Sequence, residues 1–197
     1  SSSSSRPSAA ATTTNAPMCA SPETVQKAAQ TALVRFTHAR SDLGALDVLI
    51  DGVKVFANVS YGAESIAQVI EAGSHTLELV PANQPGPIVS STPITLTGNV
   101  VHRLIAAGDV TQTVTLDVAQ GVAPASGQAT IRFAHALADA ANVDVVLADD
   151  GRVLFGDVAP QSATDGIDLD ASKPYTFEVY AAGTHQLLAQ LPNVTLM

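Results

Sequence analysis

Apolar and polar residues alternate along most of the chain from residue 31 onward. In "VRFTHA" (34–39), every second side chain from Val34 onward points to one face of an extended strand. The same period of two recurs in "ALDVLI" and "VKVFANV", which are joined by Asp51-Gly52. Asp-Gly between two apolar runs is a strong hairpin signal, so residues 45–59 are predicted to form a β-hairpin.

More short strands are expected downstream of this hairpin. Residues 66–82 predict two strands around a turn at 72–74, and Pro93 within the next strand indicates an edge position, because proline cannot donate to a ladder. Apolar runs at 100–109 and 111–119 complete the series. Many short strands separated by frequent turns are typical of a β-sandwich.

The pattern then begins again. "LVRFTHA" at 33–39 returns as "TIRFAHA" at 130–136, an offset of 97 residues. The offset grows to 99 and then 100 further on, where the insertions fall in expected loops. Self-similarity of this kind predicts a duplicated unit. The residues that match at the first offset are Arg35, Phe36, His38, Ala39, Asp47 and Val48 with Arg132, Phe133, His135, Ala136, Asp144 and Val145.

We therefore predict an all-β chain of two tandem antiparallel β-sandwiches of the immunoglobulin or transthyretin type. The first covers residues 31–118, a small-residue linker covers 119–127, and the second covers 128–197. The second unit has no match to "VVHRLIAAGD" or "TVTLDV", so we expect it to be truncated with an open edge. Open edges are normally covered or paired, and we expect the first sandwich, the N-terminal segment or a partner to cover this one.

The N-terminal segment has a different composition. Residues 1–20 are rich in Ser, Ala and Thr without periodicity, which predicts a low-complexity tail that acts as a flexible tether or stalk. We expect this tail to lie along a partner protein or a neighbouring domain. Residues 21–30 predict a short helix capped by Ser21. Because the chain begins with Ser1, we expect a leader to have preceded it. Cys19 lacks the surrounding pattern of a lipobox, so lipidation is the less favoured reading there.

Composition and charge exclude several classes of partner. The net charge is −9, and the nine Lys and Arg residues are scattered singly. Nucleic acids and anionic lipid surfaces need clusters of cations, so neither is expected to bind. No apolar run approaches the ~20 residues of a membrane span, so no direct span is expected. The single cysteine allows no disulfide within the chain.

The chain resembles the DUF4397 family of exported bacterial and archaeal proteins in the order of its motifs: an Arg-Phe-x-His-Ala strand, an Asp-Val strand and an Asp-Gly turn. The resemblance implies a sandwich on the extracytoplasmic side, in the periplasm or at the cell surface. It transfers no catalytic residue, because the family has no established enzymatic function. The usual "SPDAP" loop of that family is replaced by "RSDLGA" and "LADAAN" here. The matching motifs are Arg35 to Ala39, Asp47-Val48, Asp51-Gly52 and "GSHTLELVPA", then Arg132 to Ala136, Asp144-Val145, Asp150-Gly151 and "PYTFEVYAAG".

His38 and His135 are the first candidates for chemistry. A histidine on the inward side of a strand can act as a base or bind a metal. Zinc needs three or four ligands, whereas each unit offers one recurring histidine. We therefore predict structural roles for His38, Asp47, His135 and Asp144. Each ring would bind a loop carbonyl or a carboxylate, with Asp47 and Asp144 as candidate carboxylate partners.

Other chemistry has weaker support. The acidic stretch lacks the spacing of an EF-hand calcium loop. No nucleophile elbow, Walker loop or dinucleotide fingerprint occurs. Paired carboxylates for glycoside hydrolysis stay open, since spatial pairs are invisible in sequence. The absence of Trp disfavours a carbohydrate platform. The acidic stretch consists of Asp149, Asp150, Asp157, Asp165, Asp168 and Asp170.

These observations favour a non-enzymatic protein without a cofactor. We expect an extracytoplasmic accessory or structural subunit that binds other protein subunits. It would dock on the periplasmic side of a membrane complex or belong to a cell-surface assembly. The alternative is a small-ligand or carbohydrate-binding module of the adhesin type, and an enzyme comes third.

Overall fold

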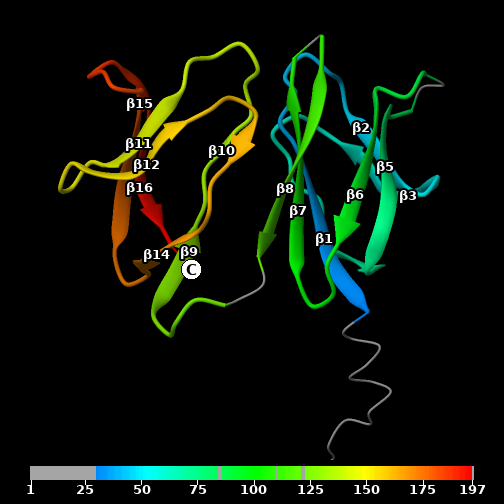
Figure 1. Cartoon of the computed structure of the whole chain (residues 1–197), viewed down its shortest axis with the longest axis horizontal. Helices are drawn as coiled ribbons and strands as arrows, with labels where there is room; N and C mark the ends of the chain where they lie inside the picture. Colours follow the sequence, from blue (N-terminus) through cyan, green and yellow to red (C-terminus); the bar gives the residue numbers. More distant parts are fainter. Residues whose placement is uncertain (1–29, 84–85, 110, 121–122, 197) are drawn as a thin grey trace, which may run out of the picture.

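The computed structural model describes residues 30–83, 86–109, 111–120 and 123–196 (Figure 1). Every element in this part of the chain is a β-strand, so the predicted all-β class is confirmed. No helix in these residues is long and apolar enough to cross a membrane. The predicted tether, the short helix and Cys19 lie outside the described residues, with Gln30 the only exception.

The first eight strands form two four-stranded sheets, with the orders β4-β1-β7-β8 and β3-β2-β5-β6. We call them the N-terminal strand group. Their bounds are β1 (Thr31–His38), β2 (Leu46–Ile50), β3 (Val53–Val59), β4 (Gln68–Glu71), β5 (Gly73–Pro81), β6 (Ser90–Leu96), β7 (Val101–Gly108) and β8 (Thr113–Gln120).

Two local predictions for this group are confirmed. Strands β2 and β3 form the antiparallel hairpin around Asp51-Gly52, both of which have positive φ. Strand β6, which contains Pro93, lies at the edge of its sheet. The alternating side chains of β1 explain how the sheets pack: Val34 and Phe36 are fully buried against the facing sheet. The group is therefore β-sandwich-like.

The expectation of purely antiparallel sheets is wrong at the centre of the group. Strands β1 and β7 pair in parallel, with Phe36 opposite Leu104. Parallel strands need a long crossover, and the chain between them supplies one because it builds β2 to β6 on the way. The turn at 72–74 does not fold β5 back on β4, because β4 pairs with β1 while β5 pairs with β2 and β6.

The last eight strands, which we call the C-terminal strand group, form one four-stranded and two two-stranded sheets. Their orders are β12-β11-β15-β16, β14-β9 and β10-β13. The bounds are β9 (Gln128–Ile131), β10 (Ala134–His135), β11 (Val143–Leu147), β12 (Arg152–Val158), β13 (Ser162–Ala163), β14 (Ile167–Asp170), β15 (Pro174–Ala181) and β16 (Leu187–Thr195).

The four-stranded sheet of the C-terminal group has the order and register of β3-β2-β5-β6. Val145 lies opposite Phe155, as Val48 lies opposite Phe56, and each hairpin has its irregularity beside that pair. Strand β9 pairs with β14 as β1 pairs with β4. Among the described residues, however, no strand of the C-terminal group takes the places of β7 and β8.

The two groups touch through β7, β8 and β10, which face each other in Figure 1. Ile105 and Ala107 of β7 point away from their own core and pack with Leu116 against Ala134 and Ala136. The backbone N–H of Gly108 also donates to the carbonyl of Ala136 at 3.0 Å. Both faces of β7 are therefore buried, one in its own group and one against the other.

Candidate functional site

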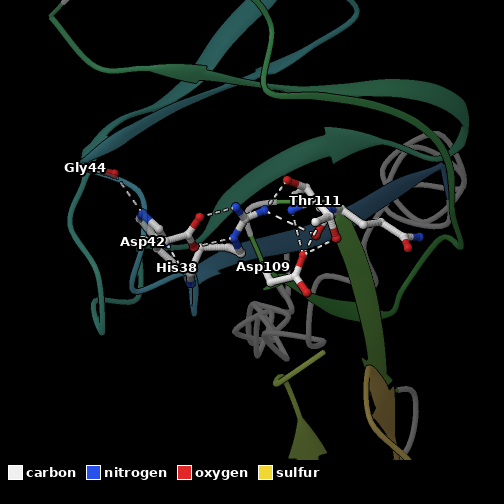
Figure 2. A network of polar contacts seen from close by, with 8 residues as sticks. His38, Asp42, Gly44, Asp109 and Thr111 are labelled. Carbon is white, nitrogen blue, oxygen red and sulfur yellow. Dashed lines mark hydrogen bonds and ion pairs between the residues drawn. The ribbon is translucent and has the colours of Figure 1, made fainter. Parts of the chain in front are cut away.

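His38 ends strand β1 with its ring fully buried. The backbone N–H of Arg40 donates to Nδ1 at 3.2 Å, so this nitrogen acts as an acceptor. The other nitrogen, Nε2, then carries the proton and donates to the carbonyl of Gly44 at 2.9 Å (Figure 2). Both ring nitrogens are used to hold the loop that follows β1.

Arg40, which no sequence pattern singled out, joins that loop to the turn between β7 and β8. Its side chain is almost completely buried and contacts both carboxylate oxygens of Asp42, at 2.7 and 2.5 Å. It also donates to the hydroxyl of Thr113 and, at 3.4 Å, to the carbonyl of Gln112. The hydrogen bond from Arg40 is the main reason that the pKa of Asp42 lies below its ordinary value.

Asp109 closes the other side of this network, which we call the Arg40 network (Figure 2). Its carboxylate accepts bonds from the hydroxyl and backbone N–H of Thr111 and from the N–H of Gln112. Those bonds, led by the Thr111 hydroxyl, lower the pKa of Asp109. The network holds the loop after β1 against the turn between β7 and β8, and it encloses the guanidinium of Arg40.

His135 makes the same contact as His38, because its Nε2 lies 3.2 Å from the carbonyl of Ala141, six residues further on. The Arg40 network is not repeated around it. The position that matches Arg40 at the offset of 97 is Leu137, which is 62% exposed. Of the contacts described around His38 and Arg40, only the histidine–carbonyl bond recurs at His135.

Asp47 and Asp144 perform a different task from the one considered for them. Asp47 accepts a bond from the backbone N–H of Asn58 at 2.8 Å, and Asp144 accepts one from the N–H of Asp157 at the same distance. Asn58 and Asp157 both have φ of 54°. Each carboxylate therefore holds an irregular, left-handed residue in the neighbouring hairpin strand, and it is the loop carbonyl that binds each histidine.

Charge and hydrogen bonding lower the pKa of both carboxyl groups. For Asp47 the first cause is Lys54, whose Nζ lies 2.5 Å away, followed by the N–H of Asn58. For Asp144 the causes are the N–H groups of Asp157 and Gly183. Both carboxylates are thus occupied acceptors with fixed partners.

His102 and Asp117 form a second histidine site, which no sequence pattern singled out. Nδ1 of the buried His102 lies 2.8 Å from an oxygen of Asp117 across β7 and β8. This pair resembles the orienting half of a catalytic triad. However, Nε2 accepts a bond from the backbone N–H of Thr97 at 3.0 Å. Since both nitrogens are occupied, the pair fastens the end of β6 to β7.

An open hollow of about 430 Å³ lies on the outer face of β11, β12 and β15. Its lining includes Asp144, Glu178, Tyr180 and His185. The hydroxyl of Tyr180 donates to Glu178 at 2.7 Å, and this bond raises the pKa of Tyr180. Across the described residues, the acidic stretch included, no three His, Cys, Asp or Glu side chains are placed to hold a metal ion.

Comparison with known proteins agrees with the family resemblance of the sequence motifs. No curated protein matches the chain. The family described as "Domain of unknown function (DUF4397)" matches residues 32–146, from β1 into β11. This is one continuous match where the sequence predicts two copies. Because it covers more than half of the 197 residues, the chain belongs to the DUF4397 family.

Proposed function

We propose that this protein is a non-enzymatic, extracytoplasmic accessory or structural subunit that acts by binding other proteins. It would dock on the periplasmic side of a membrane complex or take part in a cell-surface assembly. In this proposal the chain contains two tandem sandwiches of the immunoglobulin or transthyretin type, and the second lacks the last two strands of the first.

Recurring contacts support the duplicated arrangement. The histidine–carbonyl bond and the aspartate bond to a left-handed residue each occur once per strand group. The backbone N–H of Phe36 donates to the hydroxyl of Ser65, and that of Phe133 donates to the hydroxyl of Thr164. Because these bonds connect positions at the same offsets as the sequence repeat, duplication accounts for all of them together.

The occupied polar groups support a role other than catalysis. A general base needs a free nitrogen or oxygen aimed at the substrate. Both nitrogens of His38 and of His102 are bonded within the fold. Both carboxylate oxygens of Asp144 are bonded to backbone N–H groups as well.

The edge strand β16 is the observation that carries the proposal. It contains no charged residue between Leu187 and Thr195, and it lies at the border of its sheet. Leu187, Leu188 and Leu191 are each about half exposed along it. Natural edge strands are usually protected by charges, proline or a covering element. Strand β16 contains one proline, Pro192, but no charge, so its exposed leucines still favour contact with another protein. Its exposure also means that the first strand group does not cover it.

A carbohydrate or small ligand is the second candidate, and the hollow beside Tyr180 is the observation that favours it. Tyr180 and its bonded partner Glu178 place an aromatic ring and a carboxylate in one open depression. Sugars commonly stack on aromatic rings while carboxylates accept hydrogen bonds from their hydroxyl groups. One tyrosine gives a smaller platform than such sites need, so this function ranks below protein binding.

Cross-linking of cells that make the protein, followed by fractionation and mass spectrometry, tests both parts of the proposal. We expect the protein in the extracytoplasmic fraction, with cross-links from one or a few defined proteins to the C-terminal strand group. A monomer without specific cross-links would contradict the binding role, and recovery in the cytoplasm would contradict the location. Binding of the isolated protein to a glycan array would favour the second candidate.

A further inference from the structure

The inner face of the sheet β12-β11-β15-β16 is less well covered than its counterpart. In the N-terminal group, Leu77 and Leu79 of β5 are 1% and 0% exposed. The matching residues of β15, Phe177 and Val179, are each 9% exposed. The difference follows from the covering sheet, which has four strands in the first group and only short two-stranded pieces in the second.

Strand β9 has an open edge on the same side. In the N-terminal group, β1 lies between β4 and β7. Strand β9 pairs with β14 on one side, and the described residues place no strand on the other. Without a neighbouring strand on that side, Ile131 and Phe133 are only partly buried, whereas the matching Val34 and Phe36 are fully buried.

Leu191 gives this open region an apolar surface. It lies opposite Phe177 in the pairing of β15 with β16, so it shares the inner face, yet it is 50% exposed. The matching position in the first group is Thr92, which lies opposite Leu77. The chain therefore carries a leucine where the cover is missing and a threonine where the cover is present. A surface selected to face water would show the reverse.

We propose that the C-terminal strand group is completed by an extended, two-stranded segment of another polypeptide, which takes the places of β7 and β8. Its first strand pairs in parallel with β9, and its apolar side chains cover the inner face of β15 and β16. This inference rests on the proposed binding function and names the site and the type of partner.

The N-terminal group shows the residue pattern that such a segment needs. Strand β7 presents His102, Leu104 and Ala106 to its own core at every second position. A partner segment must likewise alternate apolar and outward-facing residues. Residues 121–197 contain nine acidic and three basic side chains, so the outward-facing positions of the partner are expected to be neutral or basic.

A partner fits this place better than a second copy of the chain. Strands β7 and β8 are already built into the N-terminal group, where Leu104 and Ala106 are fully buried. The outer side of β7 is occupied as well, since Ile105 and Ala107 pack against the C-terminal group. Pairing of β16 with β16 of a second copy would extend the sheet but would leave its inner face uncovered.

A synthetic peptide with the sequence of residues 101–120 is the probe, because this hairpin covers the equivalent face in the same chain. The intact protein is titrated against the labelled peptide by fluorescence anisotropy, and hydrogen exchange maps the binding site. We expect saturable binding, with protection of β9 and β16. A peptide carrying Leu104→Asp and Ala106→Asp, which change the core-facing positions, should lose binding.

Two neighbouring positions on β16 provide a matched pair of variants. Leu191→Asp places a charge on the inner face and should weaken peptide binding at least about tenfold, from the loss of leucine burial. Gln190→Asp adds the same charge next to it, on the outer face opposite Glu178. It also removes the hydrogen bond from the Gln190 amide to Glu178, but it leaves the inner face unchanged and should therefore change binding less than about twofold. Both residues are exposed, so neither change should unfold the protein.

The remaining outcomes separate this site from the general proposal. Absence of saturable binding, or binding that Leu191→Asp does not weaken, would overturn the completion site. So would a concentration-dependent dimer that Leu191→Asp abolishes and the peptide does not compete with, because the occupant would then be a second copy. If cellular cross-links persist in Leu191→Asp, protein binding stands and this site fails; if no cross-links form in the unchanged protein, the general proposal fails.

Discussion

Replacing Arg40 with alanine removes the central cation of the Arg40 network. The change deletes two bonds to Asp42, one to the hydroxyl of Thr113 and one to a backbone carbonyl. Hydrogen bonds to charged groups contribute about 1.5–3 kcal/mol each. The Asp42 side chain is 26% exposed and can regain water, so the loss should fall short of the sum. We expect Arg40→Ala to lower the free energy of unfolding by about 2–4 kcal/mol.

Urea denaturation followed by circular dichroism measures this loss. With an m-value of about 2 kcal/mol/M, the midpoint should fall by about 1–2 M. Leu137→Ala is the matched control, because Leu137 occupies the corresponding place in the C-terminal group and is exposed. It should change stability by less than about 0.5 kcal/mol. Arg40→Lys keeps the charge but not the two-pronged contact with Asp42, so it should give an intermediate loss.

A loss for Arg40→Ala no larger than that for Leu137→Ala would refute this reasoning. It would mean that the buried guanidinium costs as much to desolvate as its bonds return, which is a known outcome for buried ion pairs. Equal losses for the alanine and lysine variants would refute the expectation that the positive charge by itself retains part of the stability. They would show that the geometry of the pair with Asp42, rather than its charge, supplies the whole effect.

Three further predictions concern other parts of the fold. Asp51 raises the pKa of His75, so the protonated ring stabilises the fold below the ordinary value of 6.5, and this contribution is lost as the pH rises through the folded-state pKa. In Asp51→Asn, NMR titration should give a lower His75 pKa and a weaker dependence of stability on pH between about 5.5 and 8; an unchanged pKa would contradict the assignment. Gly108→Ala puts a Cβ about 2.0 Å from a backbone oxygen at φ +113°, and should cost at least about 2 kcal/mol of unfolding free energy, whereas Gly44→Ala meets no atom within 4 Å and should be nearly neutral. Ile105→Asp charges the contact between the strand groups and should split a single calorimetric transition into two, so one unchanged transition would count against that contact.

The period-two pattern predicted which residues share a face but could not predict which strands pair. It placed Val34 and Phe36 on one side of β1, and the structure buries both. It missed the parallel pairing of β1 with β7, because 62 residues separate the end of the first from the start of the second and no local signal joins them. The hairpin turn, by contrast, was predicted correctly because it depends only on neighbouring residues. Asp51-Gly52 fixes φ within a few bonds, so its hairpin needs no distant partner.

Repetition identified the recurring site residues and overlooked the unique ones. His38 and Asp47 were selected because His135 and Asp144 repeat them, and each pair makes the same bond to its own group. Arg40 has no counterpart, so the repeat gave no reason to examine it. Its partners Gln112 and Thr113 are more than 70 residues away and become neighbours only when β7 and β8 turn beside the loop. Contacts of this range depend on topology, which the sequence pattern did not supply.

The contact between the strand groups determines which part of the C-terminal group stays open. Ala134 of β10 and Ala136, just after that strand, pack against Ile105 and Leu116. This contact covers the outer surface of β10 but does not cover the inner face of β15 and β16. The first strand group therefore does not complete the second sheet. Since the half-exposed Leu191 lies on that inner face, the proposed partner segment would reach it from the side of β9 and β16, where the described residues place no strand.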